Sequence, residues 1–252
     1  MARQEGILPI SGTIGNLTFF KSSDGFMVKA RGSISADKLA NSASFERTRE
    51  NMAEFTRAGE ASKVLREAFA GSIKKSKDRR LPSRLTTEMY KVVMSDSTSK
   101  RGQRNVTDGE ASLLTGFEFN IGANLTSSIS APYTAAINRA TGEFSVNVPS
   151  FVPASFVMPP QGATHFQLFI GAAAIDFEAG TYEALTAESG GLEYGNTAVT
   201  PVSLKITLAA NSALPLFLVY GIEFMQTVNG ELYPLNNLSF NACTIVKVDT
   251  NI

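Results

Sequence analysis

The spacing of apolar residues changes once along this chain of 252 residues, close to residue 116, and this change constrains the fold most. Between residues 42 and 116, large apolar residues mostly recur three, four or seven positions apart, with alanines at the interruption, which predicts helices with one buried face. From residue 117 to 252, seven or so short apolar runs alternate with Gly, Pro and Asn clusters, which predicts an antiparallel β-sandwich of the immunoglobulin-like kind. The sequence therefore predicts an α+β fold.

We expect two to three helices in the central segment. Ser42 or Ser44 is the expected N-cap of the first helix, and Pro82 stands at the start of the second. Thr107 and Glu110 have the spacing of a capping box before a short third helix. One face of the first helix is expected to carry Phe45, Met52, Phe55, Leu65, Phe69 and Ile73, and the buried face of the second Leu85, Met89 and Val92 or Val93. The short third helix bears Leu113 and Leu114.

Ahead of the helices, the segment "GTIGNLTFFKSSDGFMVKARG" predicts a β-hairpin whose turn is Ser22 to Gly25. Gly12 and Gly15 indicate either bulges or a phosphate-binding loop. Because no Lys-Ser/Thr pair and no helix follow them, the nucleotide interpretation is disfavoured. An isolated two-stranded hairpin is marginally stable in water, so this one must pack against its own chain or against a neighbour.

These patterns divide the chain into an N-terminal hairpin arm (1–41), a basic helical region (42–116) and an acidic sandwich (117–252). The net charge is zero but unevenly distributed. Residues 1–105 contain 20 Lys/Arg and 11 Asp/Glu, whereas residues 106–252 contain 3 and 12. The two halves are complementary in charge, either within one molecule or head-to-tail between copies.

Several classes of site are disfavoured by composition. With one cysteine, Cys243, and one histidine, His165, the chain offers neither an internal disulfide nor a zinc site, and His165 has no Ser or Cys motif to activate. We expect no metal, no cofactor and no enzymatic activity. The N-terminus lacks the apolar stretch of a secretory signal, and no segment is apolar enough to cross a membrane, so we expect a cytoplasmic protein, unless it is released as an assembled extracellular structure.

Three weaker candidates remain. Asp176 and Glu178 point to the same side of a strand end, as a calcium site or an acid/base pair requires, but a solvated acidic edge is the simpler interpretation. A sugar-binding sandwich would have to use tyrosines, because the chain has no tryptophan. The basic segment 74–104 is suited to hold phosphates of a nucleic acid, but Tyr90 is its only aromatic residue. The tyrosines concerned are Tyr133, Tyr182, Tyr194 and Tyr233; the segment's cations are Lys74, Lys75, Lys77, Arg79, Arg80, Arg84, Lys91, Lys100, Arg101 and Arg104.

The runs "GTIGNLTFFKSSDGFMVKARG", "SFERTRENMAEFTRAGEASKVLR", "RLTTEMYKVV" and "RGQRNVTDGEASLLTGFEFN" resemble an uncharacterised family of Bacteroidota proteins of similar length. The resemblance covers most of the chain and is strongest over residues 6–120. It implies a bacterial origin and a hairpin–helix–sandwich plan. No activity is assigned to that family, so it implies no catalytic residue, and it is compatible with a cellular filament or a phage-like particle.

The hairpin and the opposed charges together favour a structural subunit that assembles with copies of itself through unlike surfaces into a filament, tube or ring. The expected subunit contacts are Phe19, Phe20, Phe26, Met27, Lys74, Lys75, Lys77, Arg79 and Arg80. The alternatives are a phage-like particle or tail component, a monomer whose hairpin folds back and whose sandwich binds a ligand or carbohydrate, and a nucleic-acid-binding protein.

Overall fold

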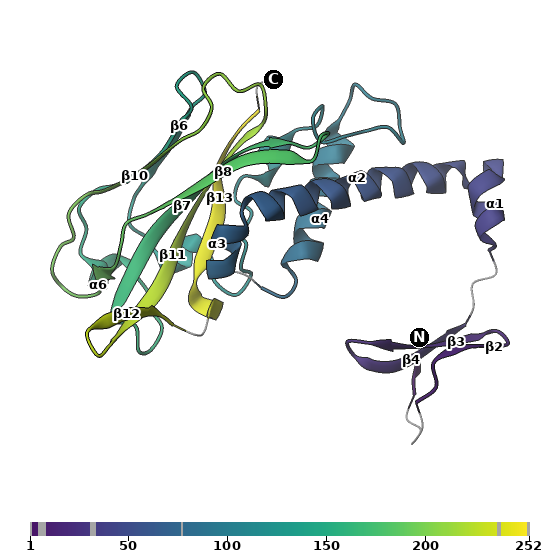
Figure 1. Ribbon diagram of the computed structural model, residues 1–252, viewed down its shortest axis with the longest axis horizontal. Coiled ribbons are helices and arrows are strands. Elements are labelled where there is room, and N and C mark those ends of the chain that lie inside the picture. The colour runs from purple at the N-terminus through teal and green to yellow at the C-terminus, as the bar shows by residue number, and fades with distance from the viewer. Residues whose placement is uncertain (1, 5–8, 31–33, 77, 236–237, 251–252) are drawn as a thin grey trace. The chain divides into compact units, whose positions relative to one another are not determined.

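A computed structural model describes residues 2–4, 9–30, 34–76, 78–235 and 238–250. The chain divides into two compact units, Met1–Glu50 and Asn51–Ile252 (Figure 1). The second unit therefore contains most of the predicted helical region, from residue 51, together with the predicted sandwich. The α+β class and the C-terminal sheets are as predicted, whereas an immunoglobulin-like arrangement is not confirmed.

The N-terminal unit contains a four-stranded antiparallel sheet in the order β1-β4-β3-β2. The predicted hairpin is its centre, and two short strands extend it. The strands are β1 (Ala2–Arg3), β2 (Gly12–Ile14), β3 (Leu17–Ser22) and β4 (Gly25–Ala30). A short helix follows, α1 (Ala36–Asn41), whose Ser35 cap accepts a hydrogen bond from the Lys38 backbone N–H at 3.2 Å.

The second unit begins within a long helix and contains two antiparallel sheets. One sheet has three strands in the order β10-β6-β5, and the other has six, with β11 and β7 at its centre. The helices are α2 (Glu46–Ala68), α3 (Ala70–Lys75), α4 (Leu81–Ser95), α5 (Leu125–Ser128) and α6 (Pro153–Phe156), with 3-10 turns at Ala43–Phe45, Ala111–Leu114 and Leu238–Phe240. The strands are β5 (Thr134–Asn138), β6 (Glu143–Val148), β7 (His165–Asp176), β8 (Thr181–Glu188), β9 (Leu192–Glu193), β10 (Val202–Thr207), β11 (Leu216–Val228), β12 (Glu231–Pro234) and β13 (Ala242–Asp249).

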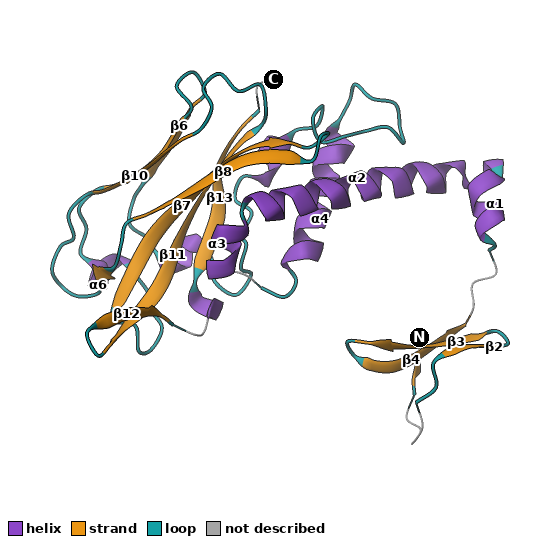
Figure 2. Ribbon diagram, viewed as in Figure 1, coloured by secondary structure: helices purple, strands orange, loops and turns teal. Residues whose placement is uncertain are grey.

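The second unit has three layers, with the six-stranded sheet in the middle (Figure 2). One core lies between the two sheets and includes Phe144, Phe166 and Tyr220. The other lies between the outer face of the six-stranded sheet and the helices, and includes Leu65 and Phe217. Because β7 and β11 are covered on both faces, they read as continuous apolar runs and not as alternating ones.

The helical predictions are confirmed in part. α4 starts beside Pro82, and its buried face contains the predicted Leu85, Met89, Val92 and Val93. In α2, however, Met52 and Phe55 are 53% and 55% exposed. Leu65 is buried as predicted, and the other buried residues of α2 are Glu54 and the smaller Ala58, Ala61, Ser62 and Val64. The alanines allow the helix to approach the core closely.

The expected helix caps are wrong. Ser42 bonds Ser44 through their hydroxyl groups at 2.8 Å and makes no side-chain cap bond to the turn that follows it. The Glu110 backbone N–H is bonded to the Ser95 hydroxyl at 2.8 Å, so the expected capping box with Thr107 does not form. Of the two leucines on the predicted third helix, Leu114 is buried and Leu113 is exposed.

Candidate functional site: the N-terminal sheet

Two tight turns build the N-terminal sheet. Ser22 and Gly25 are paired across the predicted turn, and Gly25 has a φ of 110°, a left-handed value that favours glycine. The Asp24 backbone N–H donates to the Ser22 hydroxyl at 3.1 Å, which fixes the first half of the turn. Gly15, at φ 58°, closes a second two-residue turn between Ile14 and Leu17. Gly12 and Gly15 therefore serve strand geometry, and no helix N-terminus follows them.

Both faces of this sheet carry large apolar side chains, because directly paired residues point to the same face. Phe19 of β3 pairs with Val28 of β4, and Leu17 of β3 pairs with Ile14 of β2. These four residues lie on one face of the sheet, together with Phe26. Phe20 pairs with Met27 and shares the opposite face with Arg3 and Lys29. All four apolar contact residues expected from the sequence, Phe19, Phe20, Phe26 and Met27, thus lie in one small sheet, two on each face.

No described residue of the first 50 is buried. Ile14 is 60% exposed and Leu17 is 45% exposed, while the phenylalanines are half-buried. Lysines cover part of the rings: the Lys21 ammonium lies 5.6 Å from the Phe26 centroid, and Lys29 lies 5.4 Å from that of Phe20. The sheet therefore has apolar faces but no core of its own among its described residues.

The two edges of this sheet are short. β1 pairs with only Val28 and Met27 of β4, and β2 has three residues. The Gln4 side chain continues the first edge by donating to the Met27 carbonyl at 3.0 Å and accepting from the Ile10 N–H at 3.0 Å. Sequence reasoning missed β1 and Ile14, although the pairing of Ile14 with Leu17 across Gly15-Asn16 was a readable signal.

The cations expected at a subunit contact differ in their surroundings. Lys75 is engaged within its own chain, because its ammonium lies 2.7 Å from Glu188 and 2.9 Å from the buried Glu223. Burial lowers the pKa of Lys75, but the hydrogen bonds and charges of these two carboxylates outweigh that and raise it. Lys74, Arg79 and Arg80 are exposed, and Lys77 lies outside the described residues.

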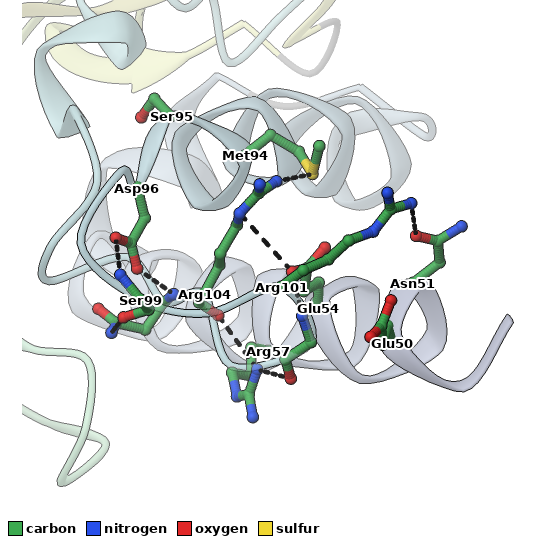
Figure 3. A network of polar contacts seen from close by, with 12 residues as sticks. Glu50, Asn51, Glu54, Arg57, Met94, Ser95, Asp96, Ser99, Arg101 and Arg104 are labelled. Carbon is green, nitrogen blue, oxygen red and sulfur yellow. Dashed lines mark hydrogen bonds and ion pairs between the residues drawn. The ribbon is translucent and has the colours of Figure 1, made fainter. Parts of the chain in front are cut away.

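The C-terminal end of the basic segment is a loop attached to α2 and α4 (Figure 3). Asp96 is buried and accepts hydrogen bonds from the backbone N–H groups of Ser99 at 2.9 Å and Asn105 at 3.1 Å. Burial opposes its ionisation, but these bonds and those of Thr98 hold the pKa of Asp96 well below its usual range. The Gly102 backbone is bonded on both sides, donating to the buried Glu54 at 2.7 Å and accepting from Arg57 at 2.8 Å.

Other cations of this segment also bond to their own chain. Arg84 pairs with Asp78 at 2.5 Å and donates to the Glu118 carbonyl at 2.9 Å, and Lys91 pairs with Glu88 at 2.8 Å. Arg104 lies 3.9 Å from Glu54. The segment therefore does not present its ten cations as one continuous surface for a nucleic acid.

The remaining candidates are placed in structural roles. His165 is half-buried, with Nδ1 at 3.0 Å from the Thr164 hydroxyl. Cys243 is fully buried, and burial raises the pKa of its thiol well above the usual value. An Asp176 oxygen accepts the backbone N–H groups of Glu178 and Ala179 at 3.0 and 2.9 Å, so this carboxylate closes the β7–β8 turn.

The four tyrosines considered for sugar binding are dispersed. Tyr182 on β8 and Tyr233 on β12 are exposed on strands at opposite edges of the six-stranded sheet. Tyr133 is half-buried, its ring 4.8 Å from that of the buried Tyr220, and Tyr194 packs against the core between the sheets. These positions form no common aromatic platform.

Within the described residues, no three or more His, Cys, Asp or Glu side chains converge as a metal site would require. None of the described helices is both long enough and apolar enough to span a membrane.

Comparisons with known proteins add little. Neither a protein-family model nor a curated protein matches the chain. Among solved structures, one similar chain comes from work on pH-induced modulation of Streptococcus parasanguinis adhesion by Fap1 fimbriae. The identity is 14%, the match covers 54% of this chain and 90% of that chain, and the TM-score is 0.28. At this TM-score the likeness carries no argument about function.

Proposed function

We propose that this chain is a non-enzymatic structural subunit that self-assembles head-to-tail into a filament, tube or ring, with the N-terminal sheet of one copy docking on the next copy. The observation that carries the proposal is the contrast within the sheet: apolar side chains on both faces, and no buried residue among those described. Burying one large apolar side chain contributes about 1.5–3 kcal/mol, so an uncovered sheet forgoes substantial stabilisation.

A second copy is a suitable cover. The first 34 residues contain four Lys/Arg and two Asp/Glu, whereas residues 106–252 have a net charge of −9. Opposite net charges steer encounter between unlike surfaces, and contact between unlike surfaces yields rings or open helical polymers. Apolar burial then supplies the affinity, since charge complementarity mainly affects the association rate.

The test compares the full-length protein with a variant lacking residues 1–34, by light scattering and negative-stain electron microscopy at low and high salt. We expect regular assemblies from the full chain and a folded monomer from the truncated one. A full-length monomer under every condition would overturn the proposal. Loss of the cooperative thermal transition on truncation would instead indicate that the sheet folds back on its own chain.

Paired substitutions show which face docks. Phe19→Ser tests one face of the sheet, and Phe20→Ser tests the other. Leu185→Ser is the control, because Leu185 is an exposed apolar residue on β8 in the second unit. We expect one of the two sheet variants to reduce assembly while the control assembles normally; reduction by the control alone would contradict the assignment to the sheet.

A further inference from the structure

A pocket of about 600 Å³ lies where α2, α3 and the start of α4 meet. Three cations line it, each from a different part of the chain: Arg66 from α2, Lys74 from α3 and Arg79 from the residues before α4. Apolar groups, including Ile73 and Leu81, form the rest of its wall. Charges beside an apolar wall attract an anion more strongly than the same charges in open water.

These cations are not neutralised by the acid beside them. Asp78 is the carboxylate that lines the pocket, and it pairs with Arg84 at 2.5 Å. It also accepts the backbone N–H groups of Ile121 at 2.9 Å and Arg80 at 2.5 Å. Burial opposes its ionisation, but these hydrogen bonds lower the pKa of Asp78, so it remains an anion committed to other partners.

The hydrogen bonding of Arg66 is a second feature of this pocket. Its Nε is buried and has no hydrogen-bond partner among the described residues. A buried donor without an acceptor costs free energy, and a guanidinium is suited to bind two oxygens of a phosphate or carboxylate at once. Because this Nε has no solvent-accessible surface, it is not itself a donor to the pocket, and Arg66 contributes its positive charge there.

We propose that this pocket binds a small anion carrying phosphoryl groups, of the size of pyrophosphate. Three cations suit a multivalent anion better than a single carboxylate, and the volume falls in the range of small-molecule sites. A nucleic acid is disfavoured because the site is a pocket and the cations towards residue 104 bond to their own chain. This inference goes beyond the proposed assembly, which depends on the N-terminal sheet.

The test is a calorimetric titration of the full-length protein with pyrophosphate and, separately, inorganic phosphate. We expect pyrophosphate to bind more tightly, and the affinity to fall as salt is raised. Arg66→Gln and Arg79→Gln should each weaken binding by about tenfold, the value of one charge-assisted hydrogen bond. Arg79 is exposed, so its substitution leaves the fold intact if Arg66→Gln does not.

Lys205→Gln is the control, because it removes one positive charge on β10 of the small sheet, outside the pocket. Equal weakening by the control would indicate non-specific charge attraction and overturn the proposal. So would an absence of pyrophosphate binding, or binding only to oligonucleotides. If the Arg66 and Arg79 variants change light scattering but not pyrophosphate titration, an acidic surface of a second copy fills the pocket instead. Pyrophosphate titration of the chain lacking residues 1–34 distinguishes the two proposals, because the pocket lies in the second unit and binding there does not depend on the N-terminal sheet.

Discussion

The two units of this chain both contain antiparallel sheets, yet among the described residues buried side chains occur in the sheets of the second unit and not in that of the first. In residues 51–252, β7 and β11 are buried on both faces, between the helices and the small sheet. In residues 1–50, no described residue is buried. The difference teaches that strand content alone does not give a unit a buried core.

The largest effect on the free energy of unfolding is expected in the six-stranded sheet, which is covered on both faces. Phe217 is fully buried and contacts Phe177 edge-on, with the ring centroids 5.9 Å apart. Phe217→Ala should lower the free energy of unfolding by about 3–5 kcal/mol, because it leaves a cavity between the sheet and the helices. Denaturant titration measures this loss of stability, and a loss below about 1 kcal/mol would contradict the close packing of Phe217 between the sheet and the helices.

A smaller effect is expected at the loop attached to α2 and α4. Asp96→Asn should cost about 1.5–3 kcal/mol near neutral pH, because it removes the charge that the N–H groups of Ser99 and Asn105 solvate.

The pH dependence has a defined sign. The folded pKa of Asp96 lies below its ordinary value of 3.8, so its contribution is present above that value and is lost as the pH falls towards the folded pKa. The difference between wild type and Asp96→Asn should therefore shrink below pH 3.8. Unfolding curves from neutral to acidic pH measure it, and a constant difference would contradict the assignment.

The ion pairs at the end of α3 should matter less. Lys75→Gln leaves the buried Glu223 without its cation and should cost about 1–2 kcal/mol, less than a fully buried pair because the lysine is partly solvated. Lys63→Gln on α2 breaks an exposed pair with Glu67 and should change stability by under about 0.5 kcal/mol. Thermal unfolding of both variants at neutral pH makes the comparison, and equal effects would contradict the structural role of Lys75.

The smallest effect on the free energy of unfolding is expected in the N-terminal sheet. Ile14 is 60% exposed, so Ile14→Ser should change the stability of the dilute, unassembled chain by under about 0.5 kcal/mol. Light scattering of the same variant at high concentration should show weaker assembly. A large loss of stability in dilute solution would show that the residue is covered by its own chain, which would erase the contrast between the units.

Turn chemistry and helix periodicity were readable from the sequence. The Ser22–Gly25 turn, the position of Pro82 and the buried face of α4 all follow from local rules. Met52 and Phe55 were placed on the apolar face of the helix because they are large and apolar, but both are exposed. Close packing instead buries the small Ala58 and Ala61. β8 was missed because its acidic and polar residues break the apolar pattern.

Long-range pairings could not be predicted. Lys75 and Glu223 are 148 positions apart, and no local pattern links them. The charge asymmetry showed that the halves are complementary but not whether they meet within one molecule, and for Lys75 the partners belong to its own chain. The apolar content of the hairpin was readable, whereas the two outer strands β1 and β2 are too short to have a pattern.

The placement of the aromatic residues has an optical consequence. The chain has no tryptophan, and all six tyrosines, including the buried Tyr220, follow residue 50. Tyrosine fluorescence and near-ultraviolet tyrosine signals therefore originate in the second unit, because residues 1–50 contain no tyrosine. A tryptophan at Phe20 would be the single indole of the molecule, and its emission would follow the exposure of that sheet alone.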